Sequence, residues 1–103
     1  MSVVVVATAL PAEGHHAEVM AAFERAVVTV HAEDAGCELY AIHEAKDRIV
    51  MIEKWASMGD LGAHGSKPAL AALRDELADR LTAPLDVVVL TPHPAGTAEQ
   101  GTL

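Results

Sequence analysis

The sequence is poor in several residue types, and each shortage excludes a class of protein. Its 103 residues include a single cysteine, Cys37, so no disulfide can form within the chain. Seven lysines and arginines stand against fifteen aspartates and glutamates, which gives a net charge of −8. Without a basic stripe to neutralise phosphates, we expect no binding to nucleic acid or to a membrane surface. No apolar run approaches the roughly 20 residues that span a bilayer.

The opening segment, MSVVVVATAL, also lacks the features of a secretory signal. No basic segment precedes its apolar run, and the run is too short, although Ala7-Thr8-Ala9 superficially resembles a cleavage site. A lone cysteine suits a reducing compartment, so we predict a cytoplasmic protein. The length predicts one domain, which we place at residues 1–92, followed by a polar and mobile tail at 93–103 to which the sequence assigns no role.

Hydrophobic patterns predict four strands, at residues 3–10, 37–44, 48–56 and 85–91. Apolar residues at steps of three and four predict a helix that contains Val19–Val30 and is followed by Gly36. After the third strand, a Ser-x-x-Asp motif predicts the start of another helix. A proline then marks a restart, and the apolar stripe that follows is formed by Leu70, Leu73, Leu77 and Leu81.

The resulting order is β-α-β-β-α-β, which predicts the α+β class and a ferredoxin-like fold with an antiparallel sheet. The strands are apolar on both faces, as in Val3–Val6, Ile49–Ile52 and Val87–Leu90, so both faces of the sheet need a cover. The two helices cover one face and the chain has no third layer. We therefore predict a homodimer through the other sheet face, in which two protomers form a dimeric α+β barrel. The alternative is a monomer with an exposed apolar sheet, prone to aggregate.

Strand periodicity places Met51, Glu53 and Trp55 on one face of the third strand. An ionised carboxylate among apolar side chains is costly unless it is hydrogen-bonded or opens onto a cavity, and burial would raise its pKa. Glu53 is therefore a candidate acid or base. The alternative is an ion pair with Arg48, with Lys54 or with a cation of a partner chain. Trp55 taken alone would be a core residue.

His64 ends the short helix that follows this strand, so its imidazole could act as a base or a hydrogen-bond donor near neutral pH. A plain role at the helix C-terminus is the alternative. The remaining histidines lack metal-binding spacing and no Cys-x-x-Cys pair occurs, so we expect no metal site. Cys37 has no neighbour that would stabilise a thiolate, and Tyr40 either lies near a cavity or fills the sheet.

The stretch VHAEDAGCELYAIHEAKDRIVMIEKWASMGDLGAH resembles the antibiotic biosynthesis monooxygenase family, small dimeric α/β-barrel proteins that include quinol monooxygenases. Four features carry the resemblance: Ala-Gly-Cys-x-x-Tyr at the start of the second strand, Glu-x-Trp at the end of the third, the serine that follows, and a histidine nine residues after the tryptophan. With the βαββαβ order, the resemblance spans about residues 2–92.

The resemblance implies a cofactor-independent monooxygenase that oxidises a small quinol-like or polyketide aromatic with O₂ in an apolar pocket, without metal, flavin or haem. It implies catalytic roles for His64 and Glu53. It implies substrate contacts from Trp55, Tyr40, Met51 and Phe23. Two other classes stay open, because one scaffold supports several activities: an isomerase or other proton-transfer enzyme acting on a small carbonyl compound, and a non-catalytic dimer that binds a small ligand.

Two departures narrow what the resemblance implies. Many members carry a second histidine shortly after the first, and this chain has Ala69 there. The chain also contains no asparagine, a residue that some of these monooxygenases use to hold the substrate. The related haem-degrading branch needs an asparagine and a histidine ligand to iron, and this chain has Leu73 near the ligand's place. We therefore do not expect haem degradation.

Overall fold

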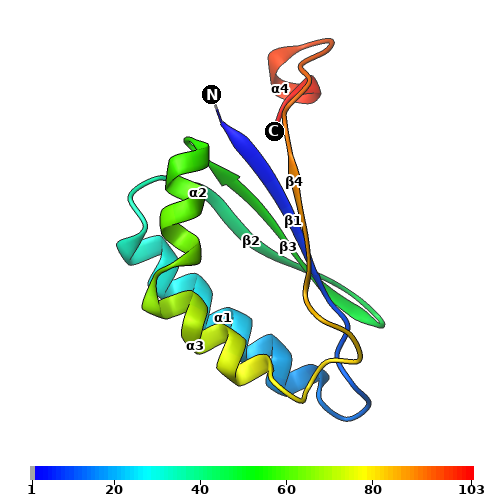
Figure 1. Cartoon of the computed structure of the whole chain (residues 1–103). Coiled ribbons are helices and arrows are strands. Elements are labelled where there is room, and N and C mark those ends of the chain that lie inside the picture. Colours follow the sequence, from blue (N-terminus) through cyan, green and yellow to red (C-terminus); the bar gives the residue numbers. More distant parts are fainter. Residues whose placement is uncertain (1) are drawn as a thin grey trace.

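A computed structural model describes residues 2–103 as a four-stranded antiparallel sheet with helices packed on one face (Figure 1). Met1, where the predicted domain begins, lies outside the described residues. The elements are β1 Val3–Ala9, α1 His16–Glu33, β2 Cys37–Ala45, β3 Arg48–Trp55, α2 Met58–Gly65, α3 Pro68–Leu77, β4 Asp86–Leu90 and α4 Ala98–Gly101. The sheet order β2-β3-β1-β4 confirms the ferredoxin-like α+β fold.

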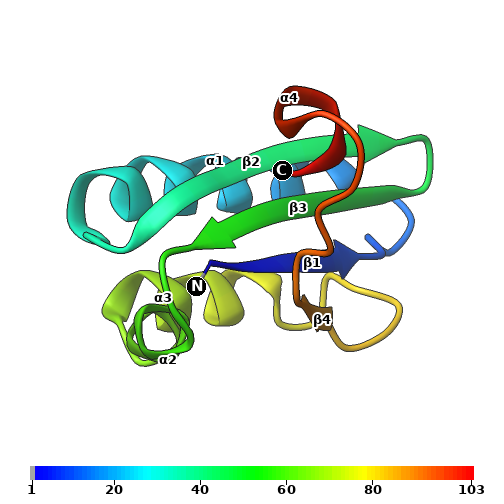
Figure 2. The same cartoon turned by 90° about the horizontal axis from the view of Figure 1, so that it is seen from above.

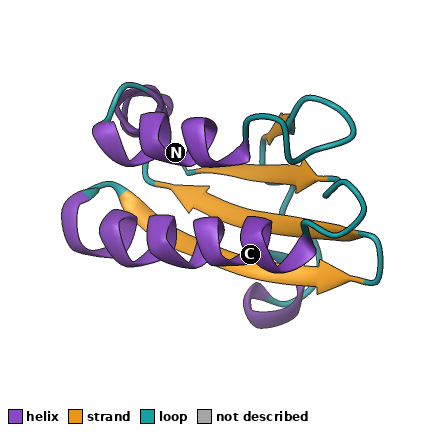
Figure 3. Ribbon diagram, turned by 90° about the horizontal axis from the view of Figure 1, so that it is seen from below, coloured by secondary structure: helices purple, strands orange, loops and turns teal. Residues whose placement is uncertain are grey.

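The helices α1 and α3 lie side by side across one face of the sheet, with α2 leading into α3 (Figure 3). Burial alternates along the central strands, as their period of two requires, and on β3 it places Met51, Glu53 and Trp55 on the helix side. The register pairs Val5 with Glu53 and Ala7 with Met51, so small side chains of β1 flank the larger ones of β3. Space for a cavity is left beneath α2 and α3.

The opposite face of the sheet is mainly apolar, although it also carries Thr8 and Lys54, and α1 and α3 do not cover it. The register brings together Val4 and Val6 of β1, Val50 and Ile52 of β3, and Val88 of the edge strand β4. We call these residues the outer face. Every residue of β4 is exposed, and Val88 retains 43% of its accessible surface. The C-terminal segment with α4 lies on this side of the sheet (Figure 2).

Two local predictions differ from the structure. The helix α3 ends at Leu77, whereas the leucine stripe predicted a continuation to Leu81. Asp79 takes a left-handed backbone conformation with φ of 64°, which no helix accommodates, and Leu81 instead forms a β-bridge with Pro11. The predicted tail contains the short helix α4, whose first turn is capped by Thr97 accepting a hydrogen bond from the Gln100 amide.

A close contact between the α1–β2 loop and α2 fixes one end of the domain. The predicted helix start is confirmed, because Ser57 Oγ accepts a hydrogen bond from the Asp60 amide at 3.1 Å. The Asp60 side chain lies against Gly36, where a Cβ atom would stand 2.2 Å from Asp60 Cγ. The Gly36 carbonyl also accepts a hydrogen bond from the Ala56 amide. Glycine at this position leaves room for the first turn of α2 to pack against the loop that follows α1.

Among residues 2–103, no helix combines the length and the apolar character that crossing a membrane requires.

Candidate active site

A cavity of about 230 Å³ lies between the inner face of the sheet and the helices α2 and α3. An apolar cavity of about 150 Å³ suffices to hold benzene, so this volume fits a somewhat larger aromatic molecule. Five of the six residues predicted for the site line it: Phe23, Tyr40, Met51, Glu53 and His64. Most of the other lining side chains are aliphatic. The fold thus gathers residues from α1, β2, β3 and α2 around one small apolar space.

Glu53 is the buried carboxyl group of the cavity, with 5% of its surface exposed. Its Oε1 accepts a hydrogen bond from Trp55 Nε1 at 2.9 Å, a contact that follows from their spacing of two residues along a strand. Burial raises the pKa of Glu53 to about 7, and the indole hydrogen bond offsets part of that rise. The predicted alternative of an ion pair with Arg48 is not found, because Arg48 pairs with Asp47.

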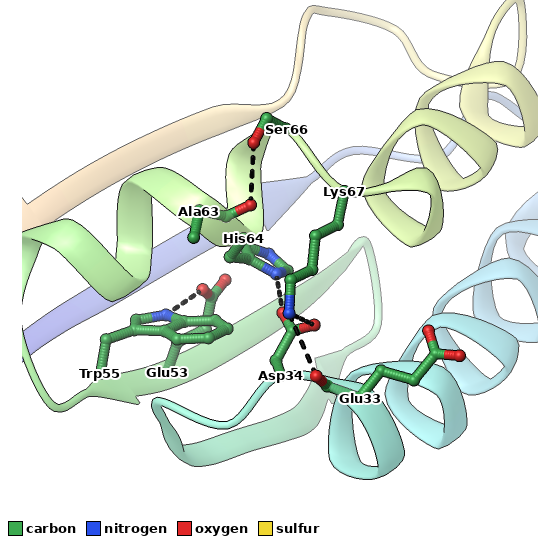
Figure 4. A network of polar contacts seen from close by, with 8 residues as sticks. All are labelled: Glu33, Asp34, Glu53, Trp55, Ala63, His64, Ser66 and Lys67. Atoms are coloured by element: carbon green, nitrogen blue, oxygen red, sulfur yellow. Dashed lines mark hydrogen bonds and ion pairs between the residues drawn. The ribbon is translucent and has the colours of Figure 1, made fainter.

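His64 reaches the cavity from the last turn of α2. Its side chain contacts a second buried carboxylate, that of Asp34 (Figure 4). Its Nδ1 lies 2.8 Å from Asp34 Oδ2, and both side chains are almost fully buried. A carboxylate accepts, so Nδ1 carries the proton and Nε2 is the ring nitrogen left for a molecule in the cavity. The imidazole is therefore held by Asp34 and does not serve as a plain cap of the helix.

The sequence analysis missed Asp34 and the lysine that accompanies it. Asp34 follows the last turn of α1, where a negative charge is disfavoured by the helix dipole, and it is 7% exposed. Lys67 Nζ lies 3.1 Å from Asp34 Oδ1 as an ion pair, and it also donates a hydrogen bond to the Glu33 carbonyl. The sequence feature that could have revealed Asp34 is its position directly after α1. A buried acidic residue at a helix C-terminus needs a cationic or N–H partner from another segment of the chain.

Aromatic packing fixes the orientation of the imidazole. The rings of Trp55 and His64 have centroids 4.4 Å apart with a tilt of 33°, and Tyr40 meets both rings edge-on. Trp55 is fully buried and is not one of the cavity-lining residues, so it lies behind Glu53 and His64. Burial, followed by the charges of Glu53 and Asp34, raises the pKa of Tyr40, so its hydroxyl stays protonated at neutral pH. Direct contact between Trp55 and a substrate stays a prediction.

The family model described as antibiotic biosynthesis monooxygenase matches residues 2–76, which is most of the folded domain. The chain belongs to the antibiotic biosynthesis monooxygenase family. The match contains every site residue named above, from Phe23 to Lys67, whereas Leu85, Val87 and Val89 of the cavity lining lie beyond it. Membership gives the protein a monooxygenase-type function at the level of the family. No curated protein sequence matches the chain significantly.

Solved structures share the fold of this family member at low sequence identity. Rv0793 from Mycobacterium tuberculosis superposes with a TM-score of 0.86 at 23% identity, covering 94% of this chain and 100% of that one. A protein of Caulobacter crescentus CB15, provisionally named an antibiotic biosynthesis monooxygenase, gives a TM-score of 0.81 at 24% identity, covering 86% and 87%. PA3566 from Pseudomonas aeruginosa gives 0.78 at 21% identity, covering 86% and 91%. These likenesses establish the architecture.

The structure also places the residues at which this family member departs from the common pattern. Ala69, which stands where many members carry a second histidine, lies in the first turn of α3 and is not one of the cavity-lining residues. Leu73 lines the cavity as an aliphatic side chain. Within residues 2–103, no three His, Cys, Asp or Glu side chains are grouped so as to hold a metal ion. Burial raises the pKa of the half-buried Cys37, which keeps it a thiol at neutral pH.

Proposed function

We propose that this protein catalyses the cofactor-independent oxygenation of a small, electron-rich phenol or quinol by O₂. One observation carries the proposal. Two buried acid–base groups, Glu53 and His64, reach the same small apolar cavity, and each is held by its own hydrogen-bond partner. A site with this composition can bind an aromatic ring, remove a phenolic proton and exclude water.

The reaction needs no electron source other than the substrate. A quinol and O₂ give a hydroxyquinone and water, so one oxygen atom enters the ring, the other leaves as water, and the quinol supplies all four electrons. Removal of the phenolic proton gives a phenolate that can pass one electron to O₂. The substrate radical and superoxide then combine as a hydroperoxide, and loss of water from it gives the product. The protein has to supply the proton transfers and a dry, shaped cavity.

The geometry favours separate roles for the two groups. His64 Nε2 is the unprotonated nitrogen when Nδ1 donates to Asp34, so His64 is the proposed base for the phenolic proton. Glu53, with a pKa near 7, is the proposed group that protonates the leaving oxygen as water forms. Tyr40 stays protonated and is the proposed hydrogen-bond donor to a substrate oxygen. The Lys67 ammonium forms an ion pair with the Asp34 carboxylate, and that carboxylate holds the imidazole in one tautomer.

The proposal is tested by oxygen uptake of the metal-stripped protein with a panel of reduced naphthoquinols and anthrones. We expect uptake well above autoxidation for at least one compound, with one atom of ¹⁸O₂ in the product and the other in water. Equal uptake with and without protein across the panel would contradict the proposal.

The same two groups could transfer protons on a carbonyl compound. Deuterium exchange into a substrate without oxygen uptake would favour that isomerase function.

We also propose that the active form is a homodimer joined through the outer face. The adjoining apolar side chains of the outer face on β1, β3 and β4 support this, because an exposed apolar patch of this kind marks a protein–protein contact. Wild-type protein should have twice the mass of the chain by light scattering. Val6→Lys places a charge on the outer face and should weaken dimerisation about 100-fold or more.

The matched control for this test is Val28→Lys, because Val28 lies on α1 with 71% of its surface exposed. The control should stay dimeric at the same protein concentration. A wild-type protein that is monomeric at high micromolar concentration, or a Val6→Lys variant as dimeric as the control, would contradict the proposed interface.

A further inference from the structure

One arginine near the cavity has no acidic partner in the part of the chain that the structure describes. Arg25 pairs with Glu76, Arg48 with Asp47 and Arg80 with Glu18, each at 2.8 to 2.9 Å. Among residues 2–103, no carboxylate lies within ion-pair distance of Arg74. The chain has fifteen acidic residues for seven lysines and arginines, so partners are plentiful. An arginine left unpaired in such a chain is available to an anionic ligand.

Arg74 stands where a ligand in the cavity would meet solvent. It lies in the last turn of α3, is exposed, and lines the cavity with Leu85 and Val87. The same three residues also line an adjoining and more open hollow of about 620 Å³. Glu53 and His64, in contrast, are 95% buried. The cavity therefore has an interior with two acid–base groups and a mouth with one cation.

We propose that Arg74 binds an acidic substituent of the substrate, so that the substrate class is a small aromatic phenol or quinol bearing a carboxylate. This rests on the proposed function, which supplies the aromatic ring and its hydroxyl group. The guanidinium binds a carboxylate in a bidentate manner, which fixes orientation as well as position. With the carboxylate held at the mouth, the hydroxyl at the other end of the ring is directed toward His64 and Glu53.

The charge distribution makes this residue necessary for an anionic ligand. The net charge of −8 repels anions from the protein as a whole, and Asp79 lines the adjoining hollow. Lys67, the other cation near the site, is paired with Asp34. Arg74 is thus the local charge that would offset this repulsion. A structural role is the alternative, because an arginine in the last turn of a helix also interacts favourably with the helix dipole.

The test measures binding without turnover. Calorimetric titration under argon compares 4-hydroxy-1-naphthoate with its neutral carboxamide, in wild-type protein and in the variants Arg74→Gln and Arg48→Gln. Wild type should bind the carboxylate about tenfold more tightly than the carboxamide, the effect of one charge-assisted pair at a partly solvated site. Arg74→Gln should remove this preference by weakening carboxylate binding alone, and Arg48→Gln should leave it unchanged.

Three results would overturn the proposal: no binding of the carboxylate, equal binding of both probes to wild type, or equal weakening of both by Arg74→Gln. The last result, with a lower urea midpoint, is what a purely structural role predicts. Because no oxygen is present, this outcome is independent of catalysis. A preference that depends on Arg74 in a protein that consumes no oxygen would contradict the proposed oxygenation and leave the carboxylate site standing.

Discussion

Replacing His64 with glutamine should lower kcat/KM for oxygenation of the best quinol by about 10²- to 10⁴-fold, the usual contribution of a positioned general base. The physical reason is that Nε2 is the ring nitrogen left as an acceptor in the neutral imidazole when Nδ1 donates to Asp34, and an amide at this position cannot remove a proton. Glutamine retains polar atoms that can still bond to Asp34, so the buried carboxylate keeps a partner. Initial rates of oxygen uptake, corrected for autoxidation, are the measurement.

Two further variants show whether the effect belongs to the imidazole. His15→Gln is the matched control, because His15 lies at the start of α1, away from the outer face, and its side chain is hydrogen-bonded to Glu18. Its rate should equal that of wild type. Asp34→Asn removes the charge that holds Nδ1 and should reduce the rate less, with a shifted pH profile, as expected of a positioning residue. If His64→Gln keeps more than a third of the wild-type rate, His64 is not the base.

Replacing Glu53 with glutamine should make the protein more stable above pH 7 and flatten the dependence of its stability on pH. The pKa of Glu53 is 4.5 in an ordinary setting and about 7 in the fold, so between these values the folded state holds one more proton than the unfolded state. The free energy of unfolding therefore falls as pH rises through this window. The difference between the two pKa values corresponds to about 3 kcal/mol in the free energy of unfolding. Wild type loses this stability between pH 4.5 and pH 7 and does not regain it above pH 7.

Urea unfolding of wild type and Glu53→Gln at pH 5, 6, 7 and 8, at one fixed protein concentration, tests this expectation. Glutamine can still accept the hydrogen bond from the Trp55 N–H. The difference between the stability–pH curves of the two proteins therefore reports the effect of the Glu53 charge alone. The control Glu24→Gln, at an exposed position of α1, should follow wild type at every pH. Parallel curves for wild type and Glu53→Gln would show that Glu53 titrates as an ordinary carboxyl group in the fold.

The parts of the structure that depend on local periodicity could be predicted from the sequence. Alternation along β3 placed Glu53 and Trp55 on one buried face, and the Ser57 motif marked the start of α2, both of which the structure confirms. The end of α3 could not be predicted from its leucine stripe, because Leu81 has the spacing of a helix residue. The left-handed backbone at Asp79 ends the helix and turns Leu81 into a bridge residue.

The partners of the site residues could not be predicted in the same way, because they depend on contacts between distant segments. Asp34 and His64 lie 30 residues apart, and their contact requires α2 to pack against the end of α1. Glycine at position 36 permits that packing, but the sequence does not say which side chain occupies the space. The role of Arg74 could not be predicted from the sequence for the same reason. An arginine without a partner is recognised only once the partners of the other arginines are known. The dimer stays a prediction.

The indole of Trp55 has a consequence for how this protein can be observed. It is the only tryptophan in the chain, it is fully buried, and it donates its one hydrogen bond to the carboxyl group of Glu53. Its ring also stacks against His64. The tryptophan emission of the protein therefore originates beside Glu53 and His64, so the protein carries a built-in optical probe of its cavity.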